Sequence, residues 1–303
     1  MRLKTLHIFG MDVFTNQPFH GNPTAVVLNA GGLSSGKMQA IASELNQETT
    51  FILMVSSEQG SLRMRYFKPS GEIELCGHGT IGAIWALAKK GMLSPEVKNL
   101  FVETKVGILG VELMWDRNRL RKVIMNQLPP VFLAAACTRE EIANALCIHP
   151  PLLNQGLAPT CASTGRAKLL IPVPNWQVLD NISPDWQAVD KLCERTGVTG
   201  VYLYTLNPRN PSATAEARQF PSGGNRAVED PVTGVAACAL GAFLVEKKVV
   251  KIKEPITKMV VEQGYAVSRP GAVEVLIHIK GEKILAAQIA GRAVAASRTL
   301  MRL

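Results

Sequence analysis

Two glycine-rich segments, far apart in the chain, each lead into an apolar run of helix-like composition. The first covers residues 76–82 and the second covers residues 229–235. A helix start carries unpaired N–H groups and about +0.5 of an elementary charge. Two such helix starts facing each other would hold a carboxylate or stabilise a developing enolate. Gly77, Gly79 and Gly234 would let the backbone approach that ligand closely. The composition is equally consistent with glycines that only let each helix pack tightly inside a sheet.

The two apolar runs predict helices that are buried on every side. In the segment 76–91, Lys89 and Lys90 precede Gly91, which is typical of a helix C-terminus. The segment 229–248 repeats this pattern, with a glycine near its start and lysines at its end. A helix that is apolar all round must be enclosed by other elements. Each helix therefore requires a sheet that wraps around it.

Strand-like runs of the required length flank both helices. In the first half, the pattern predicts strands at 6–14, 24–28, 49–55 and 62–67 and an amphipathic helix at 35–46. In the second half, residues 164–173 faintly repeat residues 21–28, which suggests a duplicated unit. We therefore predict an α/β (α+β) fold with two pseudo-repeated domains, each a curled, mostly antiparallel sheet around one buried helix.

The predicted domains cover residues 1–127 and 128–289. The turn-rich segment 127–130 separates the two halves. A last strand, within residues 286–298, has a composition that suits either half. Residues 290–303 are the segment that would rejoin the first domain.

The composition excludes several classes of protein. With 47% hydrophobic and 19% charged residues over 303 positions, the chain is typical of a folded globular enzyme. Its net charge of +9 comes from scattered lysines and arginines. The densest basic groups, at 117–122 and 247–253, are short and lack interleaved aromatic residues. We interpret them as solvated surface, with weak steering of anionic small molecules as the functional alternative, and we expect no nucleic-acid partner.

The cysteines and the N-terminus indicate a compartment. None of the six cysteines forms a C-x-x-C pair or lies at zinc-finger spacing from a histidine, so the sequence predicts reduced thiols and no metal. We recognise no secretory signal and no apolar run of about 18 residues. The expectation is a soluble, cytoplasmic protein without a membrane partner.

Several short motifs follow one another along the chain. They are DVFT at 12–15, FHGNP at 19–23, NQETTF at 46–51, CGHGT at 76–80, RQF at 218–220, EDPVTG at 229–234, EQG at 262–264 and RP at 269–270. These motifs resemble those of the PhzF-like (phenazine biosynthesis-like) family of isomerases and epimerases. They span most of the chain in the family's order, and the match is strongest to its YddE-type branch.

This resemblance implies a diaminopimelate-epimerase-like fold, a homodimer and no metal or organic cofactor. It implies a cofactor-independent isomerase that moves a carbon-bound proton on a small cyclic carboxylic acid. Glu48 would be the general acid/base in the cleft between the domains. His78 and Asp230 would contact the substrate, and the backbone at Gly77 and Gly234 would hold its carboxylate.

Physical chemistry gives these three side chains expected protonation states. A base that abstracts a proton from carbon needs a raised pKa, and Glu48 opens an apolar strand that would raise it. His78 at a helix start is expected to be neutral, and Asp230 beside the second helix start is expected to be an anion. Without the resemblance, a strand-edge carboxylate and a helix cap would account for Glu48 and Asp230.

Two departures from related enzymes leave alternatives open. Val235 occupies a position where the phenazine enzyme has a serine, so the substrate is expected to differ. Cys76 fills the first of the two thiol positions of proline racemases and diaminopimelate epimerases, but no thiol fills the second. Cys76 is therefore expected to be a small buried residue near the substrate, and Cys238 a core residue. The alternative functions are a racemase or epimerase that uses Cys76 and a ligand-binding protein without catalysis.

Overall fold

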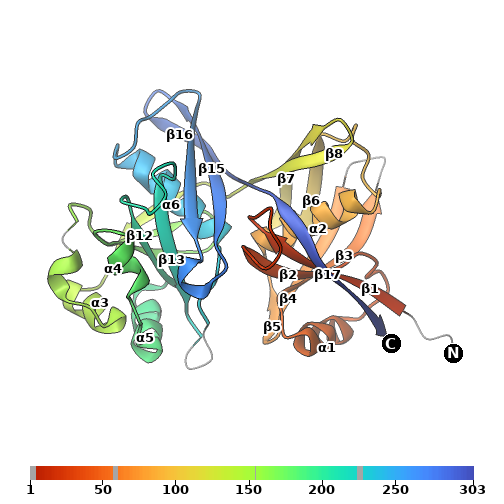
Figure 1. Ribbon diagram of the computed structural model, residues 1–303, viewed down its shortest axis with the longest axis horizontal. Helices are drawn as coiled ribbons and strands as arrows, with labels where there is room; N and C mark the ends of the chain where they lie inside the picture. The colour runs from red at the N-terminus through yellow and green to blue at the C-terminus, as the bar shows by residue number, and fades with distance from the viewer. Residues whose placement is uncertain (1–4, 57–60, 154, 224–227) are drawn as a thin grey trace. The chain divides into compact units, whose positions relative to one another are not determined.

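The computed structural model describes residues 5–56, 61–153, 155–223 and 228–303 (Figure 1). It is a mixed α/β structure with a large, mostly antiparallel sheet. The chain divides into two compact units. The first unit holds the chain up to residue 126 together with 290–303, and the second unit holds residues 127–289. Within the described ranges, no helix is both long and apolar enough to cross a membrane.

The first unit is a sheet whose strands follow the order β17-β1-β2-β3-β4-β6-β7-β8, with the short β5 beside the end of β4. Among the neighbouring strands of this order, the β2–β3 and β4–β6 pairs are parallel and the other described pairs are antiparallel. The strands are β1 (Thr5–Val13), β2 (Asn22–Val27), β3 (Thr49–Ser56), β4 (Ser61–Lys68), β5 (Gly71–Ile73), β6 (Asn99–Thr104), β7 (Gly107–Asp116), β8 (Arg119–Asn126) and β17 (Ala293–Arg302). The four strands predicted in this half agree with β1 to β4 within two residues at each end.

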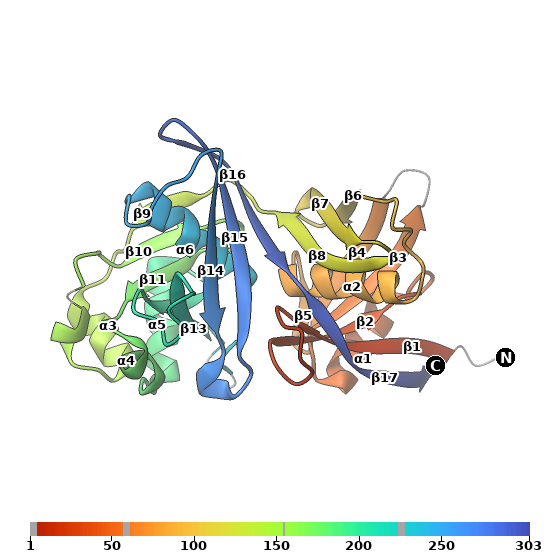
Figure 2. The same cartoon turned by 45° about the horizontal axis from the view of Figure 1, so that its top comes forward.

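Helix α2 (Gly77–Lys89) is the buried helix of the first unit. It contacts β1, β2, β3, β8 and β17, and Figure 2 shows it among these strands. Glycine lets it pack closely, because a Cβ atom on Gly82 would lie 2.9 Å from the methyl group of Thr24. Helix α1 (Ser35–Leu45) belongs to a separate apolar cluster, in which Met38 and Ile41 join Leu6 and Ile8 of β1.

The second unit has the same kind of arrangement around α6 (Gly234–Glu246). The helix is buried along almost its whole length and contacts β10, β11 and β15. The strands are β9 (Val131–Ala134), β10 (Thr160–Ser163), β11 (Lys168–Pro172), β12 (Gly200–Thr205), β13 (Ala215–Pro221), β14 (Ile256–Gln263), β15 (Gly271–Lys280) and β16 (Lys283–Gly291). The helices α3 (Arg139–Leu146), α4 (Trp176–Asp180) and α5 (Trp186–Thr196) pack on a different apolar cluster of this unit.

A last strand is present and joins the first unit, but its predicted limits, 286–298, were wrong. This segment belongs to two strands, β16 and β17, which are separated at Arg292. β17 pairs along its whole length with β1 of the first unit. The carbonyl of Arg292 accepts a hydrogen bond from the N–H of Phe14 at 2.8 Å, just beyond the end of this ladder. Hydrophobic pattern does not reveal such an interruption, because the residues on both sides are apolar.

A pair of glycine substitutions tests the close packing of α6. A Cβ atom on Gly241 would lie 2.7 Å from Cγ1 of Val275, a buried strand residue. We expect Gly241→Val to lower the free energy of unfolding by about 1–3 kcal/mol through overpacking. The control is Gly36→Ala in α1, where a Cβ atom meets nothing within 4 Å. It should be neutral or stabilise by about 0.4–1 kcal/mol. Urea unfolding measures both changes, and equal effects would contradict the packing account.

Candidate active site

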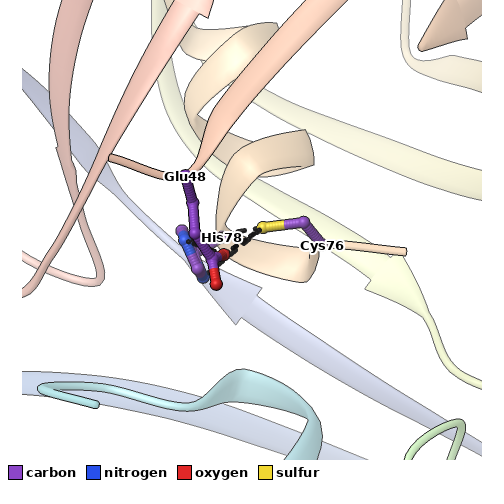
Figure 3. A group of neighbouring side chains, drawn as sticks. All are labelled: Glu48, Cys76 and His78. Atoms are coloured by element: carbon purple, nitrogen blue, oxygen red, sulfur yellow. Dashed lines mark hydrogen bonds and ion pairs between the residues drawn. The ribbon is translucent and has the colours of Figure 1, made fainter. Parts of the chain in front are cut away.

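The start of α2 and the start of β3 bring three predicted site residues together in the first unit. Figure 3 shows the side chains of Glu48, Cys76 and His78 pointing toward one another. Cys76 is the N-cap of α2, and its sulfur accepts a hydrogen bond from the N–H of Gly79 at 3.2 Å. Glu48 immediately precedes β3, and its carbonyl accepts hydrogen bonds from Ala25 N–H and the Thr24 hydroxyl. Both backbones are thus fixed by hydrogen bonds.

One carboxylate oxygen is the centre of this group. Oε2 of Glu48 lies 3.2 Å from Sγ of Cys76 and 3.2 Å from Nε2 of His78. The sulfur and Nε2 are themselves 3.5 Å apart. The thiol and the imidazole therefore both direct protons at the same oxygen. The side chain of Glu48 is 26% exposed and that of His78 is 11% exposed, so the group is partly accessible.

Lys68 is a member of the site that sequence reasoning missed. Its Nζ lies 2.9 Å from Oε1 of Glu48, so the two carboxylate oxygens have different partners. Lys68 ends β4, and β4 pairs with β3 so that Phe67 lies opposite Thr49. This register places the residue after Phe67 beside the residue before Thr49. The sequence showed both strands, but it did not show their register.

Asn22 is a second residue that the sequence analysis quoted only as part of a motif. It is buried, and its Nδ2 lies 3.4 Å from Nδ1 of His78, the ring nitrogen that does not face Glu48. Asp12 of the preceding motif accepts a hydrogen bond from the N–H of Phe19 at 2.6 Å. The two motifs at 12–15 and 19–23 therefore shape the loop that ends at Asn22, beside the imidazole.

The protonation states differ from those that the sequence predicted. Burial raises the pKa of Glu48, but the hydrogen bond and charge of His78 and the charge of Lys68 outweigh it and hold that pKa far below its usual value. Burial lowers the pKa of His78, but contact with Cys76 and the carboxylate of Glu48 raise it well above 6.5. Burial also raises the pKa of the Cys76 thiol. These shifts favour a carboxylate at Glu48 and an imidazolium at His78.

The predictions of a raised pKa for Glu48 and a neutral His78 are therefore wrong. The apolar neighbours of Glu48 do favour its neutral form, as we expected. The prediction failed because two cationic side chains, one of them unrecognised, lie within 3.2 Å of the carboxylate. The field of a helix start is smaller than the attraction of a carboxylate in direct contact, so it does not keep His78 neutral.

Asp230, Gly234 and Val235 lie together at the start of α6 in the second unit, whereas Gly77 is the first residue of α2 in the first unit. The hydroxyl of Thr233 donates to Oδ2 of Asp230 at 2.5 Å. The buried Gln263 donates from Nε2 to the carbonyl of Asp230 at 2.6 Å and accepts from the N–H of Thr233 at 3.1 Å. Gly234 is the first residue of the helix, and Val235 follows it half-buried. Gln263, from the EQG motif, thus organises this helix start, a role that the motif alone did not indicate. Cys238 is fully buried in α6, as predicted.

Substitution of Glu48 tests the assigned protonation states. In Glu48→Gln the imidazole loses its anionic partner, so the pKa of His78 should fall toward or below its ordinary range. In the wild type, protonated His78 stabilises the fold at low pH, and this contribution is lost as pH rises through the raised pKa. Two-dimensional NMR of the histidine ring nitrogens measures the titration, with Glu44→Gln on α1 as the matched control. An unchanged His78 titration in Glu48→Gln would contradict the ion pair.

Comparison with known proteins gives the chain its family. The family model described as "Phenazine biosynthesis-like protein" matches residues 11–299. An uncharacterised isomerase from Clostridium acetobutylicum is 32% identical over 296 residues, which are 96% of each chain. The uncharacterised isomerase YddE of Escherichia coli K12 is 33% identical over 291 residues, which are 95% of each chain. A crystal structure of a PhzF-family protein from Bacillus anthracis superposes with a TM-score of 0.88 at 34% identity and covers 98% of this chain and 99% of that one. The chain therefore belongs to the PhzF-like family of isomerases.

Proposed function

We propose that the protein is a cofactor-independent isomerase that moves a carbon-bound proton on a small cyclic carboxylic acid, with Glu48 as the general acid/base. The observation that carries this proposal is the arrangement around one carboxylate at the start of α2. Oε2 of Glu48 lies 3.2 Å from each of two proton-bearing groups, and Oε1 is held by Lys68. A carboxylate with defined proton partners can take a proton from one carbon and return it to another.

The neighbours of Glu48 support each part of such a transfer. Removal of a proton from carbon leaves a carbanion or an enolate, whose negative charge needs compensation. Lys68, the imidazolium of His78 and the N–H groups at the start of α2 supply positive charge and hydrogen-bond donors for it. The proton carried by Glu48 then returns to a different carbon, which regenerates the carboxylate. The net reaction changes only the position of one hydrogen and one double bond.

Glu48 is a weak base in the free protein, so the substrate carboxylate would have to activate this base as well as anchor the substrate. An anionic substrate competes with Glu48 for Lys68 and His78, and each ion pair that it weakens makes Glu48 a stronger base. Burial then acts in the same direction, because it disfavours the charged carboxylate. In this proposal the base becomes reactive only when an acidic ligand is bound.

Asp230, Gly234 and Val235 of the second unit stay predicted substrate contacts. Asp230 and the N–H groups around Gly234 offer an acceptor and donors at the start of α6. Val235 offers a methyl surface where a serine would offer a hydroxyl, so the substrate would have an apolar group there. The homodimer, the cytoplasmic location and the domain limits 1–127 and 128–289 stay predictions.

Deuterium exchange tests the proposed role of Glu48. A panel of cyclic hydroxy- and amino-acids, including a dihydro-hydroxyanthranilate, is incubated in heavy water and followed by proton NMR. We expect exchange or isomerisation of at least one compound with the wild type and a loss of about 10²–10⁴-fold in Glu48→Gln. Cys76→Ser should retain most of the rate, and Glu44→Gln on α1 should retain all of it.

The other outcomes distinguish the alternative functions. The contact between Cys76 and Glu48 at 3.2 Å makes a thiol-dependent racemase the second candidate. Exchange that survives Glu48→Gln and disappears in Cys76→Ser would replace the isomerase by that racemase. Compounds that bind without any exchange would instead indicate a ligand-binding protein.

Lys68→Met tests how the basicity of Glu48 is set. Without this cation the carboxylate loses a stabilising charge, so the pKa of Glu48 should rise. The acidic limb of kcat/KM for the compound that reacts should therefore move to higher pH, because this limb reports the base of the free enzyme. Lys105→Met is the matched control, since Lys105 pairs with Glu72. If the acidic limb of the pH profile does not move in Lys68→Met, Lys68 does not set the pKa of Glu48.

A further inference from the structure

The side chains of Glu48, Cys76 and His78 offer three different metal-ligand atoms that all lie within 4.8 Å of one another. We propose that this cluster captures a zinc ion, which replaces the protons needed for catalysis and so inhibits the enzyme. The binding stands on geometry alone. The inhibition rests on the proposed function, because it requires Glu48 to be the catalytic base.

The separations of the ligand atoms match a tetrahedral zinc site. Zn–S and Zn–N or Zn–O bonds of about 2.3 and 2.05 Å at tetrahedral angles place sulfur about 3.6 Å from nitrogen or oxygen, and nitrogen about 3.4 Å from oxygen. Here Sγ of Cys76 lies 3.5 Å from Nε2 of His78 and 3.2 Å from Oε2 of Glu48. Nε2 lies 3.2 Å from Oε2. An ion would therefore fit with shifts of a few tenths of an ångström.

The exchange of protons for zinc balances in charge. In the free protein the thiol of Cys76 and the imidazolium of His78 each direct a proton at Oε2 of Glu48. A zinc ion takes the place of these two protons and leaves a thiolate, a neutral imidazole and the carboxylate as its ligands. Zn²⁺ enters and two H⁺ leave, so the net charge of the cluster stays the same. Because the net charge does not change, the electrostatic repulsion between the zinc ion and Lys68 is largely offset.

The surrounding groups hold the three ligand atoms in place. The N–H of Gly79 donates to the sulfur at 3.2 Å, which stabilises a thiolate. Lys68 binds Oε1 of Glu48 and leaves Oε2 for the ion. Nδ2 of Asn22 lies 3.4 Å from Nδ1 of His78, and a half-turn of this amide would bring its oxygen there as acceptor for the Nδ1–H of a metal-bound ring.

The ligand types favour zinc over calcium and magnesium. A thiolate and an imidazole are soft or intermediate donors, whereas calcium and magnesium require oxygen ligands. Three protein ligands leave the fourth position for water or a substrate oxygen, as in other open zinc sites. The partial exposure of Glu48, 26% of its side chain, gives an ion a path to the cluster.

Zinc titration of the metal-free full-length protein tests the site. Calorimetry with zinc chloride should give one ion per chain, and Co²⁺ should give the near-ultraviolet band of a cobalt–thiolate bond. Cys76→Ser and His78→Asn should each weaken zinc binding by about tenfold or more. The matched control Cys147→Ser removes an exposed thiol and should change nothing. Lys68→Met should tighten binding by roughly threefold or more, because it removes a nearby positive charge.

The outcomes separate this inference from the proposed function. No zinc binding by the wild type would overturn the site, as would binding that survives both Cys76→Ser and His78→Asn or is lost in Cys147→Ser. Weaker binding by Lys68→Met would also count against it, whereas tighter binding excludes a general loss of structure in that variant. Calorimetry needs no substrate, so the site can be established even if no compound exchanges deuterium. If exchange is found, zinc should abolish it at the concentration that fills the site.

Discussion

The carboxylate of Glu48 is a largely buried negative charge, and the arrangement of the site follows from the need to compensate it. Lys68 and the imidazolium of His78 supply opposite charge within 3.2 Å, and the Cys76 thiol supplies a further donor. Burial alone would favour the neutral form of the group, but these partners keep it ionised. The same compensation makes Glu48 a weak base in the free protein. An acidic substrate that draws the cations away would therefore be part of the activation.

The buried position of α2 fixes where these groups lie. A Cβ atom on Gly79 would lie 2.4 Å from the hydroxyl of Thr50 and 2.9 Å from the sulfur of Cys76. Glycine is thus required there by packing and by the approach of the N–H to that sulfur. The sequence left open whether these glycines serve packing or ligand approach. For Gly79 the packing requirement is sufficient, and the ligand role of Gly77 and Gly234 stays part of the proposal.

Proton transfer and zinc binding draw on the same property of the cluster. Three ionisable groups of different types converge on one oxygen, and each can exist with or without a proton. A substrate that changes the balance of charge would activate the carboxylate, whereas an ion that displaces the protons would block it. The protonation of a buried carboxylate is expected to respond to ligands and ions where other titratable groups contact it directly.

The family, the main strands and the two buried helices can be predicted from the amino-acid order alone, because ordered motifs and hydrophobic periodicity are local properties. The sequence also identified Glu48, Cys76 and His78 as candidates, and the structure brings all three together. The role of Lys68 could not be predicted in this way, since it is the register of β3 and β4 that places Lys68 against Glu48. The protonation states of Glu48 and His78 also depend on contacts in the folded protein, and they are the reverse of what the sequence predicted. A pKa in a buried site depends on charges within a few ångströms in space, and residues 20 or 30 positions away in sequence supply them.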